Sequence, residues 1–441
     1  MMKGVKYLVS LLAVMLILIA LLAGCNRGGN EGAAEGEVIT LRGMHWSSST
    51  VDHLRWGRTF DMWHEINPNI VIDFEWYTTG FAERLVVLFA SGDSPDFFQN
   101  GIMDLGQRID AGMIKAITPW FEAENFDMND LMEAGVVRYR GEVYGVLPTT
   151  QPQVLYYNRD MFIEAGLDFP NDNWTWDDLV YHSRALTLTD ASGRVTQFGF
   201  QCDEFNRLWL SIFWSNGGQA FDNPDYPTQP LFNGPAGVGA AQFMLDLIVG
   251  FGVAPPPGAE GTLGYREAFT NGHVAMILDG SWMTGQFASA EDLDFGIAMV
   301  PMGSHQRGGW ISPTHMSMST QTQHPDAVWE FMKHFFGYEN SLMWAGMGDM
   351  TIMNGIPVWR SAYEDERFTM TPEVEAKYRQ ALESNLVYSF PYVGMWFGDY
   401  INSGLQLMLI EGRDPQTVLD DIANSTINTI FPLMEEAAAR R

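Results

Sequence analysis

Cys25 is the residue whose type and surroundings point most directly to a chemical reaction. It follows Leu22-Ala23-Gly24 at the end of an almost uninterrupted apolar run over residues 7–22, and two lysines precede the run. Positive charge, an apolar stretch and small residues at a cleavage point define a bacterial signal peptide. A cysteine directly after Ala-Gly is typical of a lipobox, in which the cysteine is acylated, for example with palmitate, and becomes the new N-terminus. The sequence therefore predicts a lipoprotein signal peptide over residues 1–24. A single transmembrane anchor is the alternative, because the run approaches the span of a bilayer.

The segment that begins with the cysteine is expected to act as a tether. Residues 25–37 are rich in Gly, Ala and Glu, and beyond Cys25 they contain no apolar side chain larger than alanine. Such a segment buries too little surface to offset its ordering entropy, so it is expected to stay flexible. We expect an exported protein, anchored through acylated Cys25 to the lipid bilayer at the outer face of the cytoplasmic membrane. In a host with an outer membrane, the anchor would sit in a periplasm-facing membrane.

Charge and length exclude some classes of function and favour two lobes. The formal net charge of −29 argues against nucleic acid as a partner, because nucleic-acid binding requires basic patches. About four hundred residues follow the predicted signal peptide, which is more than one hydrophobic core normally serves. Cys202 is the only cysteine besides Cys25, so no intramolecular disulfide is expected once Cys25 is acylated.

No catalytic or metal centre is indicated by the sequence. It contains no phosphate-binding loop, no dinucleotide-binding loop and no nucleophile elbow, and its nine histidines lack the spacing of zinc ligands. The acid pairs at 177–178, 420–421 and 435–436 fit helix starts and solvated helix faces. We therefore expect a protein that is not an enzyme and holds no cofactor or metal. Two carboxylates facing each other across a cleft, as in a glycoside hydrolase, are not detectable from sequence alone.

The elements that would position a site alternate between strand and helix. Residues 38–46 have the pattern of a strand, and a helix follows in which Trp56, Phe60 and Trp63 share one face. Apolar and polar residues then alternate over 70–76, which indicates a second strand. This order predicts a β-α-β unit with parallel strands, and hence an α/β fold.

Several short motifs occur in a fixed order along the chain and together resemble one known family. They are the lipobox, residues 94–98 (SPDFF) with 110–120, residues 144–148 (YGVLP) with 155–160 and 174–179, residues 269–282 (FTNGHVAMILDGSW), and Gly308-Gly309-Trp310 before a helix at 325. Each motif is weak alone. The ordered set resembles the extracellular solute-binding lipoproteins of ABC importers, of the maltodextrin- and oligosaccharide-binding type.

This resemblance implies a periplasmic-binding-protein-like fold of two α/β lobes. In that family each lobe has a mixed, mostly parallel sheet flanked by helices, and crossing strands form a hinge that closes on the ligand. Carried onto this chain, lobe I is expected at 38–148 plus 277–313, and lobe II at 149–276 plus 314–441. The crossings are expected at 147–149, 275–278 and 311–314. The implied protein is a monomer that captures a carbohydrate, an oligosaccharide, and delivers it to the permease subunits of an ABC transporter.

Candidate ligand-binding residues combine aromatic and polar side chains, because a sugar offers both an apolar ring face and hydroxyl groups. Trp282 matches the position of an aromatic residue in the family, and Trp46 with Ser47 follows the first strand, at the end where open α/β sheets bind ligands. For each tryptophan, a place in the core is the alternative. The full set of candidates is Trp46, Ser47, Glu83, Asn100, Asp104, Gln151, Trp209, Asp279, Trp282, Trp310 and Trp396.

Other ligands remain open at this point. A glycerophosphodiester would require converging arginines, and none cluster at the candidate positions. A polyamine would require several acids, and Glu83, Asp104 and Asp279 keep that alternative open. A surface glycoside hydrolase is the remaining alternative.

Overall fold

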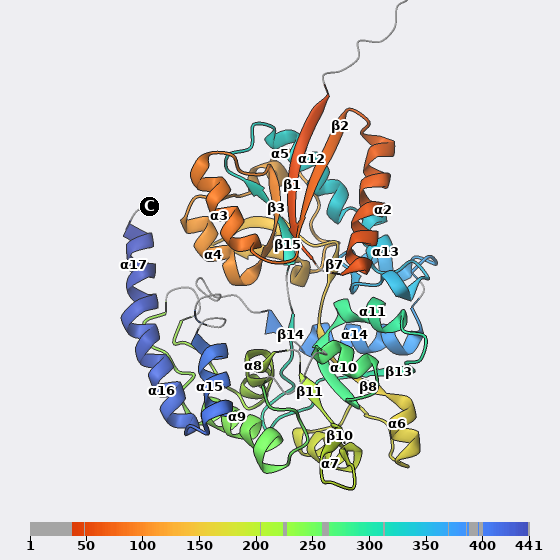
Figure 1. Cartoon of the computed structure of the whole chain (residues 1–441). Helices are drawn as coiled ribbons and strands as arrows, with labels where there is room; N and C mark the ends of the chain where they lie inside the picture. The colour runs from red at the N-terminus through yellow and green to blue at the C-terminus, as the bar shows by residue number, and fades with distance from the viewer. Residues whose placement is uncertain are drawn as a thin grey trace, which may run out of the picture. The chain divides into compact units, whose positions relative to one another are not determined.

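The helices and strands of the protein fall into two α/β lobes, each built on its own sheet (Figure 1). The computed structural model describes residues 38–47, 49–202, 204–223, 227–257, 264–311, 314–368, 370–384, 386–387, 396 and 400–439. Cys25, the predicted signal peptide and the predicted tether lie outside these ranges. No helix within them is long and apolar enough to cross a membrane.

The first lobe contains a five-stranded sheet in the order β2-β1-β3-β15-β4. β1 runs parallel to β2 and to β3, and helix α2 connects β1 to β2, which confirms the predicted β-α-β unit. β15 is antiparallel to β3 and β4, because the chain enters this strand from the second lobe. The elements are β1 (Ile39–Trp46), α2 (Thr50–Ile66), β2 (Ile70–Tyr77), β3 (Phe97–Gly101), β4 (Ile114–Lys115) and β15 (Thr314–Ser319).

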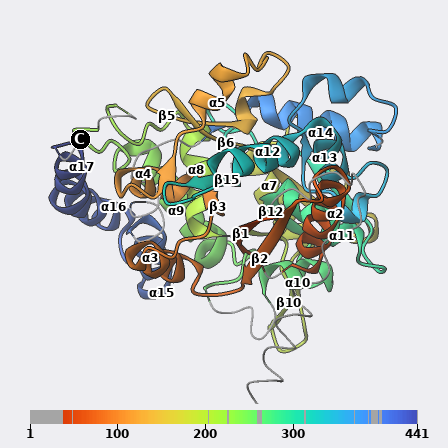
Figure 2. The same cartoon turned by 90° about the horizontal axis from the view of Figure 1, so that it is seen from above.

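Helices cover both faces of this sheet (Figure 2). Phe97 and Phe98 follow each other along β3 and therefore point to opposite faces. Phe97 packs in the core beneath α2, α12 and α13, where Trp56 stacks on Phe335 at 4.8 Å, whereas Phe98 packs in the core beneath α3 and α4. The helices of this lobe besides α2 are α3 (Phe81–Ser91), α4 (Ile102–Asp110), α5 (Thr118–Ala123), α12 (Pro325–Phe336) and α13 (Tyr338–Trp344).

The second lobe contains a four-stranded sheet in the order β11-β12-β8-β13. One of its strand pairs is parallel and two are antiparallel. The resemblance implied a mixed, mostly parallel sheet, so this sheet is mixed as expected but is not mostly parallel. The strands are β8 (Gln153–Asn158), β11 (Gln201–Cys202), β12 (Met276–Gly280) and β13 (Phe295–Ala298). The helices around it are α6 (Arg159–Glu164), α7 (Trp176–Leu186), α8 (Phe205–Ser215), α9 (Pro235–Leu245), α10 (Tyr265–Thr270), α11 (Thr284–Ala288), α14 (Pro372–Ser384), α15 (Ser403–Glu411), α16 (Pro415–Ser425) and α17 (Phe431–Ala439).

Strand pairing divides the chain differently from the expected lobe boundaries. Residues 277–313 were expected in lobe I, but β12 and β13 both pair with β8 in the second sheet. Residues 314–441 were expected in lobe II, but β15 pairs with β3 in the first sheet, and α12 and α13 pack on the first core. The expected boundaries were carried over from the family resemblance, and the strand patterns of the sequence could not correct them because such patterns do not show which sheet each strand joins.

Three stretches of chain meet between the two sheets. The first runs from β6 (Glu142–Val146) through β7 (Thr149–Thr150) into β8, where a crossing was expected. The second contains β14 (Trp310–Ile311), whose Ile311, at the start of an expected crossing, bridges to Pro152. The third is β16 (Ile356–Pro357), which pairs antiparallel with β7. The expected crossing at 275–278 is wrong, because these residues lie inside the second sheet.

Candidate functional site

A cavity of about 530 Å³ lies where the two sheets face each other, and both lobes line it. The first lobe contributes the carboxyl end of β1, the first turns of α2 and parts of β3 and β15. The second contributes the residues after β12 and the first turns of α8 and α10. Ligands of open α/β sheets bind at the carboxyl ends of strands, and the volume suits a small organic ligand.

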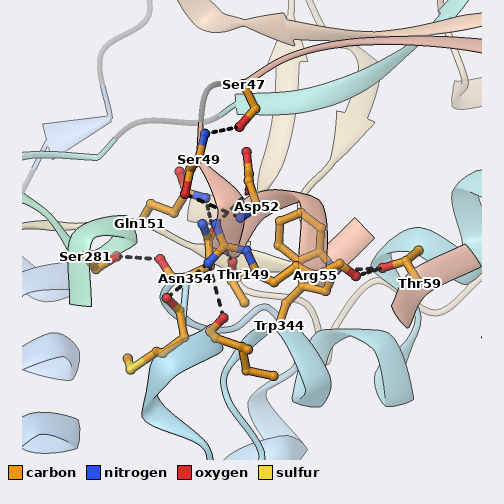
Figure 3. Close-up of polar contacts among 12 residues, drawn as sticks. Ser47, Ser49, Asp52, Arg55, Thr59, Thr149, Gln151, Ser281, Trp344 and Asn354 are labelled. Carbon is orange, nitrogen blue, oxygen red and sulfur yellow. Dashed lines mark hydrogen bonds and ion pairs between the residues drawn. The ribbon is translucent and has the colours of Figure 1, made fainter. Parts of the chain in front are cut away.

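The start of α2 places an ion pair at this cavity. Ser49 caps the helix by accepting a hydrogen bond from the backbone N–H of Asp52, and this turns Asp52 and Arg55 toward the cavity (Figure 3). Arg55 Nη2 lies 2.7 Å from Asp52 Oδ1, and Arg55 Nη1 donates to the carbonyl oxygens of Ile352 and Met353. Burial alone would raise the pKa of Asp52, but the charge of Arg55 holds the pKa of that carboxyl below its usual value. The pair is therefore ionised and internally neutralised.

His45 adds an uncharged ring to the same wall. It lies on β1 in edge contact with Trp56 and Trp76, at centroid distances of 5.0 and 5.3 Å. Burial lowers the pKa of His45 to about 4, and the nearby Asp52 only partly offsets this effect. The imidazole is consequently neutral at physiological pH and contributes no charge to the cavity.

This buried histidine predicts a loss of stability in acid. A His that titrates near pH 6.5 when unfolded and near pH 4 when folded binds more protons in the unfolded state between these values, so unfolding is favoured as the pH falls. The shift corresponds to roughly 3 kcal/mol of unfolding free energy, present above pH 6.5 and lost by pH 4. We expect chemical denaturation to show that the free energy of unfolding of His45→Gln falls by roughly 3 kcal/mol less than that of the wild type between pH 6.5 and pH 4. The matched control is His64→Gln, at an exposed position of α2. Parallel stability curves for the wild type and His45→Gln would refute the prediction.

The opposite wall is aromatic and holds a second ion pair. Trp282 lines the cavity and packs against Trp310, with 5.5 Å between the ring centroids. Arg207, on the first turn of α8, lies 4.6 Å from the ring of Trp310 and 5.8 Å from that of Trp282, and it pairs with Glu204 at 3.4 Å. Gly280 lies flat against the indole of Trp282, since an added Cβ would come within 2.0 Å of the ring.

A third ion pair joins a residue of the same wall to a carboxylate behind it. Arg266, on α10, lines the cavity and makes two hydrogen bonds to the fully buried carboxylate of Asp279, at 2.7 and 3.2 Å. Asp279 also accepts the backbone N–H of Gly280, which fixes the turn leading to Trp282. Each of the three arginines at the cavity, Arg55, Arg207 and Arg266, therefore has a carboxylate partner.

Four of the predicted site residues line the cavity. Trp46 is 52% exposed at the end of β1, and the buried Ser47 follows it. Gln151 reaches the cavity from the segment that joins the lobes, and Trp282 from the second lobe. An indole as exposed as that of Trp46 contributes little to a core, so its place at the cavity has no packing explanation.

The other predicted residues do not line the cavity. Glu83 is exposed on α3, while Asn100 and Asp104 both contact Arg108 in the first lobe. Trp209 and Trp396 are fully buried in the core of the second lobe, 6.4 Å apart, and Trp209 stacks on Phe213. Asp279 and Trp310 lie one layer behind the cavity wall, in contact with Arg266 and Trp282 respectively.

Sequence reasoning missed several residues of the site. It found no arginines at the candidate positions, whereas three line the cavity. The spacing of Asp52 and Arg55 at i, i+3 after a helix cap was the only local signal for any of them. The missed residues that line the cavity include His45, Asp52, Arg55, Gln99, Glu204, Arg207, Tyr265, Arg266, Glu267, His315, Trp344 and Asn354.

Two known binding proteins are similar to this chain in sequence over part of their length. Over 220 residues the sequence is 26% identical to the arabinooligosaccharide-binding protein of Halalkalibacterium halodurans, a match that covers 47% of each chain. Over 203 residues it is 23% identical to the sn-glycerol-3-phosphate-binding periplasmic protein UgpB of Agrobacterium fabrum, covering 43% of this chain and 44% of that one.

A solved structure confirms the predicted two-lobed α/β fold. It is the ABC substrate-binding protein Lmo0181 from Listeria monocytogenes in complex with cycloalternan, which matches with a TM-score of 0.79 at 20% identity. The match covers 89% of this chain and 99% of that one. In addition, residues 58–341 match the family model of the bacterial extracellular solute-binding proteins. Since that match spans more than half of the sequence, the chain belongs to the family of bacterial extracellular solute-binding proteins.

Proposed function

We propose that this protein binds an oligosaccharide in the cavity between its lobes and delivers it to the permease of an ABC importer. The observation that carries the proposal is the combination of aromatic walls with arginines whose charges are already matched by carboxylates. Trp46 and Trp282 approach the cavity from different lobes, and the three arginines there are each matched by a carboxylate. Such a cavity suits an uncharged ligand with apolar faces and many hydroxyl groups.

Two of the similar proteins support this choice by their ligands. One binds arabino-oligosaccharides, and the other holds cycloalternan in its solved structure. We further propose that the protein works as an exported monomer anchored by acylated Cys25, and that it catalyses no reaction. An acyl chain with a flexible tether would hold it near its permease while leaving the lobes able to move.

A phosphate ester is the second candidate, because a relative binds sn-glycerol 3-phosphate and three arginines line the cavity. Phosphate recognition uses guanidinium groups that are available for bidentate contact. Here Arg55 and Arg266 already donate to Asp52 and Asp279, so a phosphate would have to compete with these carboxylates. Polyamine binding has less support, because Glu83 and Asp104 do not line the cavity and Asp279 is bonded to Arg266. Among the described residues this leaves Glu267 as the lining carboxylate that pairs with none of the three arginines, whereas a polyamine would require several acids.

Thermal unfolding of the protein from Val38 onward, with a panel of solutes, tests the proposal. The panel contains maltotriose, mannobiose, an arabino-oligosaccharide, sn-glycerol 3-phosphate and spermidine. A ligand that binds only the folded state stabilises it, by about 2.7 kcal/mol when the free ligand is at a hundred times its Kd, and therefore raises the melting temperature. We expect a shift with at least one oligosaccharide and none with the phosphate ester or the polyamine. A shift with the phosphate ester or the polyamine, and none with any oligosaccharide, would overturn the carbohydrate assignment. Release of shorter sugars during incubation would show that the protein is an enzyme.

A further inference from the structure

Asn354 lines the cavity and joins separate parts of the chain by hydrogen bonds (Figure 3). Its side-chain oxygen accepts hydrogen bonds from Thr149 Oγ1, at 3.0 Å, and from Gln151 Nε2. Its backbone oxygen accepts from Ser281 Oγ at 3.1 Å, next to Trp282. One residue that is only 4% exposed thus connects the segment between the lobes to the second-lobe wall.

The surroundings of Asn354 leave it little freedom to move. The preceding carbonyl groups of Ile352 and Met353 accept hydrogen bonds from Arg55, which ties this stretch to the start of α2. Gly355 follows in close contact with the crossing segment, because an added Cβ would come within 2.2 Å of the backbone oxygen of Thr150. The backbone on either side of Asn354 is therefore held in place.

This arrangement fixes the orientation of the Gln151 side-chain amide. A threonine hydroxyl and an amide –NH2 both donate to the same oxygen of Asn354, so the –NH2 of Gln151 points at Asn354 and its Oε1 points elsewhere. Among the described residues, Oε1 of Gln151 has no hydrogen-bond partner, and Gln151 lines the cavity. Oε1 of Gln151 is thereby available at the cavity as an acceptor for a hydrogen bond that a sugar hydroxyl donates.

We propose that Asn354 is a positioning residue for ligand binding, which orients the amide of Gln151 so that its oxygen accepts a hydroxyl of the bound sugar. This inference rests on the proposed function, since it names a further residue of the same site. It assigns to Gln151 the direct contact and to Asn354 the orientation of that contact.

The test compares Asn354→Leu with a matched control. Leucine has a similar size and removes the side-chain hydrogen bonds of Asn354. The control is Asn158→Leu, because Asn158 is also a buried asparagine that accepts a hydrogen bond, but it lies at the far end of β8 and does not line the cavity. With the panel sugar that stabilises the wild type most, we expect calorimetry to show binding by Asn354→Leu weakened about tenfold and binding by Asn158→Leu unchanged. Equal affinities for Asn354→Leu and the wild type, or equal losses in both variants, would overturn the inference.

A double-mutant cycle and a conservative variant separate positioning from general damage. If Asn354 acts through Gln151, the loss in Gln151→Leu/Asn354→Leu should be clearly smaller than the product of the two single losses. Asn354→Asp keeps an acceptor for Thr149 and Gln151 and should recover part of the affinity lost in Asn354→Leu. Additive losses, or no recovery, would show that Asn354 does not orient Gln151.

A ligand-free measurement keeps this inference apart from the choice of ligand. The –NH2 group of Gln151 donates to Asn354 Oδ1, and leucine at position 354 removes this acceptor. We expect the side-chain –NH2 protons of Gln151, followed by NMR, to exchange with solvent faster in unliganded Asn354→Leu than in the wild type, and at an unchanged rate in Asn158→Leu. If no panel sugar binds the wild type, the proposed function fails, and unchanged exchange of the Gln151 –NH2 protons overturns the inference itself.

Discussion

Trp46→Ala is expected to weaken oligosaccharide binding about thirtyfold and to leave the free energy of unfolding nearly unchanged. Tryptophans at binding sites commonly contribute about 2 kcal/mol or more, which corresponds to this factor in Kd. The substitution should change the free energy of unfolding little, because the indole is 52% exposed and its ring nitrogen makes one long hydrogen bond, 3.3 Å to Thr78 O. Isothermal titration with the best panel sugar, together with denaturation of the free protein, measures both quantities.

Two variants sharpen the prediction for Trp46. Trp46→Phe keeps a ring face for stacking and should retain most of the affinity. Tyr181→Ala removes an aromatic side chain that is 65% exposed on α7, outside the residues that line the cavity, and should leave affinity unchanged. Unchanged binding by Trp46→Ala would show that the exposed indole does not contact the sugar.

Arg266→Met is expected to lower the free energy of unfolding by about 3 to 5 kcal/mol, because it leaves the carboxylate of Asp279 buried without its partner. Asp279 is fully buried, and Arg266 is the side chain that meets it with two hydrogen bonds. Urea denaturation at neutral pH measures the loss. The same substitution should also weaken ligand binding, since Arg266 lines the cavity and Asp279 fixes the turn at Gly280.

The double variant Arg266→Met/Asp279→Leu provides the contrast. Replacing both members of a buried pair with apolar side chains of similar size is often close to neutral, so the double variant should be more stable than Arg266→Met alone. Arg42 forms a surface ion pair, with Nη1 2.6 Å from Asp93 Oδ1. Arg42→Met removes this pair and should lower the free energy of unfolding by no more than about 1 kcal/mol. A double variant as unstable as the single one would contradict this account of the pair.

The first β-α-β unit was predictable because its signals are local. Alternation over 70–76 and the helical spacing of Trp56, Phe60 and Trp63 state which face of each element is buried, and the structure confirms both elements. The acid pair at 177–178 is local in the same way, and the structure places it in the first turn of α7, as expected for a helix start. Where the relevant neighbours lie within one helix or one strand, residue spacing is sufficient.

The site was only partly predictable because its neighbours are distant in sequence. Trp46 and Trp396 both looked like possible stacking residues, yet the first is exposed at the cavity and the second is fully buried against Phe221 and Phe232. Arg55 reads as an ordinary helix residue until the carbonyl groups of Ile352 and Met353 are placed beside it by the fold. No pattern within a short window distinguishes these cases.

The pairing of β15 with β3 has a consequence for the order of folding. β3 stays an open sheet edge until β15 is available, and every strand of the second sheet lies between them in the chain. Contacts between such distant segments slow folding, because the loop must close before the pairing stabilises anything. A nascent chain that ends before Thr314 therefore has no means of completing its first sheet, and the protein remains incompletely folded until most of it has been synthesised. A late-folding chain of this kind stays compatible with passage through a narrow export channel.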